Sequence, residues 1–350
     1  MVKGSKKGIP MVGKSLMREN VGAGPKGAFV GALLAAPFKP FRLFVTVFAL
    51  LLLALAPAIS HAVIKPVYIY KLSDFQGVIP YSEVMLSVDE TFNEVFAVHI
   101  GEGTVSIFNH KGMETFIFGE DGSLGRIYSL AVRKDGNMVA LSYNNPEKPE
   151  FRLLNYRGEP VSKFKLKDPP PEFEGFCPNR IIYKNEKIYM VSHGAMKVAI
   201  ADENGKFIEG FDFYKLTGIG EENPEDAGLG GFAVDGKGTM YFTLPVPARA
   251  YTVSPEGVLR TFGKRGGAPG RFGVPFGIEA DEEGNIYIAD KLKSVVMIFD
   301  KDFKFIRQFG GWGRREHNLI SPSGLVILRD QVLVSQIGRM GVSVFRLSNE

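Results

Sequence analysis

The stretch 272–310, FGVPFGIEADEEGNIYIADKLKSVVMIFDKDFKFIRQFG, decides the fold, because it predicts four short strands separated by turns. The second strand, NIYIAD at 285–290, follows a turn that ends in Gly284, where glycine supplies a positive φ. The third strand, at 295–299, is apolar enough to be covered on both faces, and the fourth alternates phenylalanine with polar residues. This stretch therefore predicts one small four-stranded sheet.

The same phrase recurs along the chain. Counterparts of NIYIAD begin at residues 94, 137, 187, 239, 285 and 331, with spacings of 43, 50, 52, 46 and 46 residues. Six copies at this period nearly fill the 288 residues from 63 to 350. Four strands per repeat at this period indicate a β-propeller, in which each sheet buries its faces against neighbouring sheets. We therefore predict an all-β fold, a six-bladed propeller of four-stranded blades over residues 63–350.

The ends of the repeat region predict how the ring closes. The sixth repeat ends after its third strand, near Leu347, and the segment VYIYKL at 67–72 precedes the first repeat. We expect this N-terminal segment to complete the last blade, because joining both ends of the chain in one blade removes open sheet edges.

Several repeats resemble the NHL-repeat family, in its exported bacterial type. The resemblance is carried by VPFGIEAD at 274–281, GNIYIAD at 284–290 and SPSGL at 321–325, with KDGN at 134–137 and GKGT at 236–239. Blades one and three diverge from this pattern. The resemblance implies a six-bladed propeller, in a family that includes extracytoplasmic binding scaffolds, domains of larger signalling proteins and a few metal-dependent lyases. Related six-bladed propellers include lactonases.

The first 62 residues differ from the rest in charge and hydropathy. Residues 1–42 form a basic region with eight Lys or Arg and one acid, so they sum to +7 and residues 43–350 to −3. An uncharged run, LFVTVFALLLLALA at 43–56, precedes the small-residue ending Ser60-His61-Ala62. This pattern is typical of a secretory signal cleaved near Ala62. The alternative is that 43–62 stays as a transmembrane helix, since a span needs about 20 apolar residues.

Both alternatives place residues 63–350 outside the cytoplasm. We expect a periplasmic or secreted protein after cleavage, or one anchored in the inner membrane by 43–62. A single cysteine excludes an intrachain disulfide framework and a cysteine-based zinc site. An exported domain with a charge of −3 is a poor candidate for nucleic-acid binding.

The loops that join strand two to strand three, and each blade to the next, leave a propeller on one face. The long ones here are 119–125, 167–179, 214–230, 263–273 and 310–321. Because arginine and aromatic residues are enriched in binding surfaces, we predict a binding face on this side. Its candidate residues are Arg126, Arg180, Arg249, Arg271, Phe276, Trp312 and Arg314. We expect a protein or peptide partner in the cell envelope and no catalytic residue, with the membrane contacted only through the N-terminal hydrophobic segment.

The alternative is a metal-dependent lyase or a lactonase-like hydrolase with a site in the central channel. His99, His193 and His317 are weak candidates for ligands of a divalent metal, because a convincing site needs at least three ligands. Only Glu279 and Arg180 add charge to the first strands, which argues against a calcium cage. We therefore predict no cofactor. The repeated aspartates Asp135, Asp235, Asp281 and Asp290 are expected to accept hydrogen bonds from turn amides.

Overall fold

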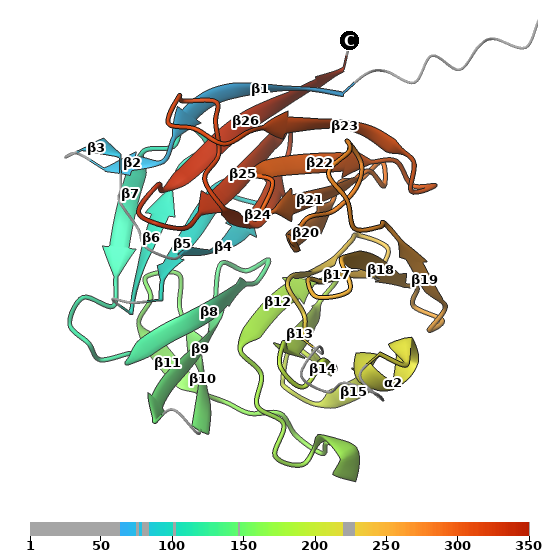
Figure 1. Ribbon diagram of the computed structural model, residues 1–350. Coiled ribbons are helices and arrows are strands. Elements are labelled where there is room, and N and C mark those ends of the chain that lie inside the picture. The colour runs from blue at the N-terminus through green and yellow to red at the C-terminus, as the bar shows by residue number, and fades with distance from the viewer. Residues whose placement is uncertain are drawn as a thin grey trace, which may run out of the picture. The chain divides into compact units, whose positions relative to one another are not determined.

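The computed structural model describes residues 64–74, 77–78, 84–100, 103–145, 148–219 and 228–349. They form an all-β fold of six four-stranded sheets, as the repeat predicts (Figure 1). The basic region 1–42, the hydrophobic segment 43–62 and the cleavage point near Ala62 lie outside these residues. In the part of the chain that is described, no helix is both long and apolar enough to cross a membrane.

Each four-stranded sheet is one blade, and in blades 1 to 5 the four strands follow one another in the sequence. Blade 1 contains β4 (Val84–Asp89), β5 (Glu94–His99), β6 (Thr104–Phe108) and β7 (Glu114–Phe118). Blade 2 contains β8 (Arg126–Val132), β9 (Met138–Asn145), β10 (Lys148–Leu154) and β11 (Pro160–Phe164). Blade 3 contains β12 (Arg180–Lys184), β13 (Lys187–Ser192), β14 (Lys197–Asp202) and β15 (Phe207–Asp212). Blade 4 contains β16 (Phe232–Val234), β17 (Met240–Leu244), β18 (Arg249–Val253) and β19 (Leu259–Phe262).

Blade 5 contains β20 (Pro275–Ala280), β21 (Ile286–Asp290), β22 (Val295–Phe299) and β23 (Phe305–Gly310). Blade 6 contains β24 (Pro322–Leu328), β25 (Gln331–Gln336), β26 (Val342–Asn349) and β1 (Ile64–Lys71). Here β1 pairs antiparallel with β26, so the earliest described strand and the last strand of the chain share one sheet. The remaining elements are short: β2 (Ser73–Asp74), β3 (Gly77–Val78), the 3-10 helix Pro171–Phe173 and α2 (Phe213–Thr217).

The first strands of the blades form the inner wall of the ring. They contact one another in the order β4, β8, β12, β16, β20, β24 and back to β4. Hydroxyl groups join several neighbours: Ser87 donates to the Leu130 carbonyl, and Ser129 accepts from the Ile181 amide at 3.0 Å. These bonds satisfy backbone groups at strand edges that lack a partner strand. The inner wall is therefore hydrogen-bonded across blades by small polar side chains.

Glycine lets two inner strands approach closely between blades 5 and 6. A Cβ on Gly277 would lie 2.9 Å from the Cα of Gly324, which is closer than side-chain carbons pack. These two glycines belong to the VPFG and SPSG motifs of the repeats. Glycine at this position of the two repeats is explained by the close approach of neighbouring inner strands.

Aromatic side chains fill the junctions between blades. At the junction of blades 3 and 4, Phe213 of α2 stacks on Phe242 with ring centroids 4.4 Å apart, and Phe242 stacks on Tyr251 at 5.0 Å. Phe213 and Phe242 are fully buried. The short helix α2 therefore acts as a plug that extends the core of this junction.

The turns between first and second strands carry the repeated aspartates, and the prediction for them is confirmed. Asp281 accepts a hydrogen bond from the Asn285 amide at 2.7 Å and another from the Tyr287 hydroxyl at 3.0 Å. Asp235 accepts equivalent bonds from the Thr239 amide and the Tyr241 hydroxyl. Asp135 accepts from the Asn137 amide.

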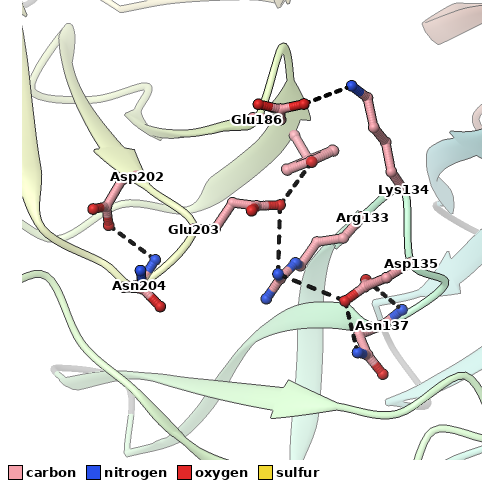
Figure 2. A network of polar contacts seen from close by, with 9 residues as sticks. Arg133, Lys134, Asp135, Asn137, Glu186, Asp202, Glu203 and Asn204 are labelled. Atoms are coloured by element: carbon pink, nitrogen blue, oxygen red, sulfur yellow. Dashed lines mark hydrogen bonds and ion pairs between the residues drawn. The ribbon is translucent and has the colours of Figure 1, made fainter.

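Blade 2 departs from this pattern, because Arg133 occupies the turn position that Asp281 holds in blade 5. Its guanidinium lies 3.4 Å from Glu203 of blade 3 and 3.6 Å from Asp135 (Figure 2). Lys134 and Glu186 form a second ion pair between the two blades at 2.8 Å. On this face, which we call the turn face, Arg133 and Lys134 are thus matched by acids of the same or the next blade.

The close approach of blades 5 and 6 gives a first prediction. Gly277→Ala should lower the free energy of unfolding by about 1–3 kcal/mol, because the added methyl group meets backbone atoms that have no room to move. Gly236→Ala is the matched control, since a Cβ there meets no atom within 4 Å. Urea denaturation followed by circular dichroism measures both variants. Equal stability of the two would contradict the close approach.

Candidate functional site

Five segments of blades 4, 5 and 6 form a continuous surface on the loop face, opposite the turns. They are 245–249, 263–274, 291–294, 311–321 and 337–341, and we call them the blade 4–6 loop surface. Hydrogen bonds connect them in order around the ring. Arg265 donates to the Val246 carbonyl, and Lys293 Nζ donates to the carbonyls of Ala268 and Arg271 at 2.9 Å. The Gly311 amide donates to the Ser294 carbonyl, and the Ile337 amide donates to the Ser321 carbonyl.

A buried carboxylate anchors the middle of this surface. Asp290 ends β21 and is fully buried. It accepts hydrogen bonds from the amides of Gly273 at 2.7 Å, Val274 at 3.1 Å and Lys293 at 2.9 Å. The carboxylate therefore joins the loop that enters blade 5 to the turn that follows its second strand. This confirms that Asp290 binds turn amides, although the turn is on the loop face.

The two long loops of the surface, 263–274 and 311–321, are held in place in the same way. In the first, Arg265 forms a parallel backbone bridge with Phe272, and in the second Trp312 forms one with Leu319. Phe272 and Leu319 are fully buried, so each loop is held by an apolar side chain that enters the core. The Asn318 side chain also donates to the Trp312 carbonyl at 3.0 Å. The backbone at Trp312 is therefore fixed on both sides.

Large apolar side chains project from this fixed backbone. Trp312 is 81% exposed and Leu292 is 71% exposed, more than any other large hydrophobic residue in the described ranges. Val246 at 49% and Ile337 at 36% belong to the same surface. Exposed apolar side chains on a rigid base are typical of interaction sites.

The same five segments are strongly basic. They contain nine Lys or Arg residues and a single acid, Glu316. Among the described residues, none of the seven exposed cations makes an ion pair. These seven are Arg249, Lys264, Arg265, Arg271, Arg314, Arg315 and Arg339. Lys291 differs, because its ammonium group lies 3.1 Å from the centroid of the half-buried Phe276 ring.

The structure brings together most of the predicted binding residues. Arg249, Arg271, Trp312 and Arg314 belong to the blade 4–6 loop surface, and Phe276 lies beneath Lys291 at its inner edge. Arg126 begins β8 between blades 1 and 2 and is not part of this surface. Leu292, Val246 and Ile337 also belong to the surface and were not predicted from the sequence. An apolar residue in a short turn between two basic residues, as in Lys291-Leu292-Lys293, was the available signal.

Arg180 belongs to a separate charged group on the inner strands. It begins β12, and its charge opposes the rise in the pKa of Glu279, which burial raises to about 7. An ion pair of 2.6 Å joins Lys184 of blade 3 to Glu90 of blade 1, so charged side chains of blades 1, 3 and 5 influence one another across the ring.

The three candidate histidines lie in different environments. His99 is buried, and its Nε2 lies 3.1 Å from Ser106 Oγ. The His193 ring lies 2.7 Å from the Asn179 side-chain oxygen, and burial together with the Arg180 charge lowers its pKa to about 3. His317 is exposed in the loop 311–321. Within the described ranges, no three His, Cys, Asp or Glu side chains gather as a metal site would require. The metal candidates therefore stay predictions.

Asp290 gives a second prediction. Asp290→Ala should lower the free energy of unfolding by about 2–4 kcal/mol, because it leaves buried amides without their acceptor. It should also speed hydrogen exchange at Gly273, Val274 and Lys293 first, which mass spectrometry measures. Asp300→Ala, in an exposed turn of the opposite face, serves as the control. Unchanged exchange at the three amides would contradict the anchoring role.

His99 gives a third prediction, on pH dependence. Burial lowers its pKa to about 4, whereas the ordinary value is 6.5. Its contribution to stability is therefore full above pH 6.5 and is lost as the pH falls toward 4, by about 2–3 kcal/mol. His99→Gln should flatten this part of the pH profile of thermal unfolding, and His317→Gln should leave it unchanged. Identical profiles for His99→Gln and the wild type would exclude this origin.

Comparisons with known proteins agree with the repeat pattern. RING finger protein nhl-1 of Caenorhabditis elegans is 40% identical over 74 residues, which cover 21% of this chain and 8% of that protein. Protein brain tumor of Drosophila melanogaster is 33% identical over 69 residues, or 20% of this chain and 7% of that protein. Protein lin-41 of Caenorhabditis elegans is 41% identical over 54 residues, or 15% and 5%. The chain thus matches only a small part of each relative, and no family model matches it.

Solved structures share the fold at low sequence identity. A protein of unknown function from Bacteroides thetaiotaomicron has a TM-score of 0.58 and 13% identity, covering 81% of this chain and 76% of its own. The calcium-binding protein regucalcin of Agrobacterium tumefaciens has a TM-score of 0.54 and 14% identity, with coverage of 81% and 98%. Virginiamycin B lyase of Staphylococcus aureus has a TM-score of 0.52 and 12% identity, with coverage of 78% and 84%. The chain is therefore a six-bladed β-propeller, and the relatives that it matches over part of its length are NHL-repeat proteins.

Proposed function

We propose that this propeller is a non-catalytic scaffold that binds a protein or peptide partner through the blade 4–6 loop surface. The observation that carries the proposal is the side chain of Trp312, 81% exposed above a backbone that a bridge and a side-chain hydrogen bond hold in place. A large aromatic side chain on a rigid base binds at low entropic cost, and tryptophan is enriched among the residues that dominate interface energetics.

We further propose that the propeller is exported and meets its partner in the cell envelope. The support for this lies in the sequence of residues 1–62, where a basic region precedes an uncharged segment and a small-residue ending. Sequencing the N-terminus of the mature protein tests the cleavage. A start at Val63 is expected for a cleaved signal, and an intact segment 43–62 would favour the anchored alternative.

A metal-dependent lyase or lactonase-like hydrolase in the channel is the second candidate. The observation in its favour is Glu279, whose pKa of about 7 suits a group that exchanges protons near neutral pH. Titration calorimetry with Zn²⁺ and Ca²⁺ separates the candidates. Metal binding that is lost in both Glu279→Gln and His193→Ala would favour the enzyme, and no binding would favour the scaffold.

A double substitution on the loop face gives a fourth prediction. Trp312→Ala with Leu292→Ser should reduce capture of the partner by about ten-fold or more, which corresponds to about 1.4 kcal/mol or more of lost binding energy. The measurement is quantitative mass spectrometry after affinity capture of the tagged full chain from its own cells.

Phe92→Ser with Tyr156→Ala is the matched control, because these exposed hydrophobic residues lie in turns on the opposite face. The control should capture the partner as the wild type does. Undiminished capture by the loop-face variant, or equal loss in both variants, would overturn the proposal.

A further inference from the structure

We infer that the partner segment received by the blade 4–6 loop surface is acidic and carries a large apolar side chain. The inference rests on the proposed function and adds the chemistry of the partner. It follows from the charge of the surface, the fixed geometry of its loops and the kinds of side chain that it exposes.

The first step is the local charge. The five segments hold nine cations and one acid, although the chain from residue 43 to 350 sums to −3. The surface is therefore a concentrated positive region on an otherwise acidic propeller. A region of this kind raises the local concentration of acidic partners and orients them as they approach.

The second step is that the positive charges are uncompensated. On the turn face, Lys134 pairs with Glu186, and Arg133 lies between Asp135 and Glu203 (Figure 2). On the loop surface, Arg271, Arg314 and Arg339 are exposed and make no ion pair among the described residues. Their guanidinium groups are free to form bidentate bonds with the carboxylates of a partner.

The third step is that other basic residues hold the loops in place. Lys293 bonds the carbonyls of Ala268 and Arg271, and Arg265 bonds that of Val246. With Asp290 below them, these contacts order the loops before any partner arrives. Binding then carries only a small entropic cost for ordering the loops.

The fourth step concerns the apolar groups. Leu292 lies between Lys291 and Lys293 in the sequence, and Trp312 lies two residues before Arg314. Apolar and cationic residues are thus close neighbours along two of the loops, which fits a partner segment that carries both carboxylates and a large apolar residue. Single-stranded nucleic acid is a weaker fit, because its bases need aromatic platforms and only one of the four exposed apolar residues is aromatic.

The chain contains a single tryptophan, so its fluorescence reports directly from this surface. The full chain would be titrated with a short synthetic peptide of Asp and Glu around a central pair of leucines. Three further probes are the same peptide with Lys in place of the acids, a single-stranded RNA, and vesicles that contain phosphatidylserine. We expect the acidic peptide to shift the Trp312 emission to the blue, to bind most tightly of the four, and to bind more weakly as salt rises.

Variants locate the site by charge. The triple variant Arg271→Glu, Arg314→Glu and Arg339→Glu should weaken binding of the acidic peptide by about ten-fold or more. The control variant Lys111→Glu, Arg157→Glu and Lys301→Glu changes the net charge equally at exposed turns of the opposite face and should bind as the wild type does. Thermal unfolding of both variants shows that they are folded.

The outcomes separate this inference from the proposed function. If Trp312→Ala with Leu292→Ser abolishes partner capture while no acidic peptide binds, the scaffold stands and the acidic partner is wrong. Tighter binding of RNA or of vesicles than of the acidic peptide, or equal loss of binding in both triple variants, also overturns the inference.

Discussion

The candidate site depends on the hydrogen bonds that the buried carboxylate of Asp290 accepts from backbone amides. The carboxylate accepts hydrogen bonds from Gly273 and Val274 of the loop entering blade 5 and from Lys293 of the turn that leaves β21. A buried charge is tolerated only when its hydrogen bonds are satisfied, and here backbone amides satisfy it. In blade 6 the equivalent residue, Gln336, accepts a hydrogen bond from the Ile320 amide of the loop that enters this blade. Exposed groups such as Trp312 are thus supported from the ends of second strands.

The two faces of the ring differ in how their charged side chains are used. On the turn face, repeated aspartates bind turn amides, and ion pairs such as Lys134–Glu186 cross between blades. These charges are satisfied within the molecule and contribute to its architecture. On the blade 4–6 loop surface the charges are supported by ordered backbone but are not neutralised, and apolar side chains lie among them. In the described part of the chain, the clustering of unpaired cations with the exposed side chains of Trp312 and Leu292 is the physical basis for assigning binding to this surface.

Much of the fold was predictable because the same strand pattern recurs in each repeat. The alternation in NIYIAD recurs in the second strand of each blade, so the spacing predicts six blades. The Asp281 turn itself recurs in blade 4, and blade 2 keeps its glycine. Loop residues such as Arg271 and Trp312 were predictable from composition. The separation of Arg180 and Arg126 from them was not, because it depends on which blade and which end of a strand each residue occupies. Leu292 was missed because a single apolar residue in a turn carries no periodic signal.

Photo-cross-linking from position 312 tests the central claim most directly. A photoreactive phenylalanine analogue would replace Trp312 in the full chain, with Tyr156 on the turn face replaced in a parallel sample. We expect position 312, and not position 156, to cross-link to a partner, at a segment rich in Asp and Glu with a large apolar residue. Equal cross-linking from both positions, or cross-links from 312 only to segments without acidic residues, would contradict it.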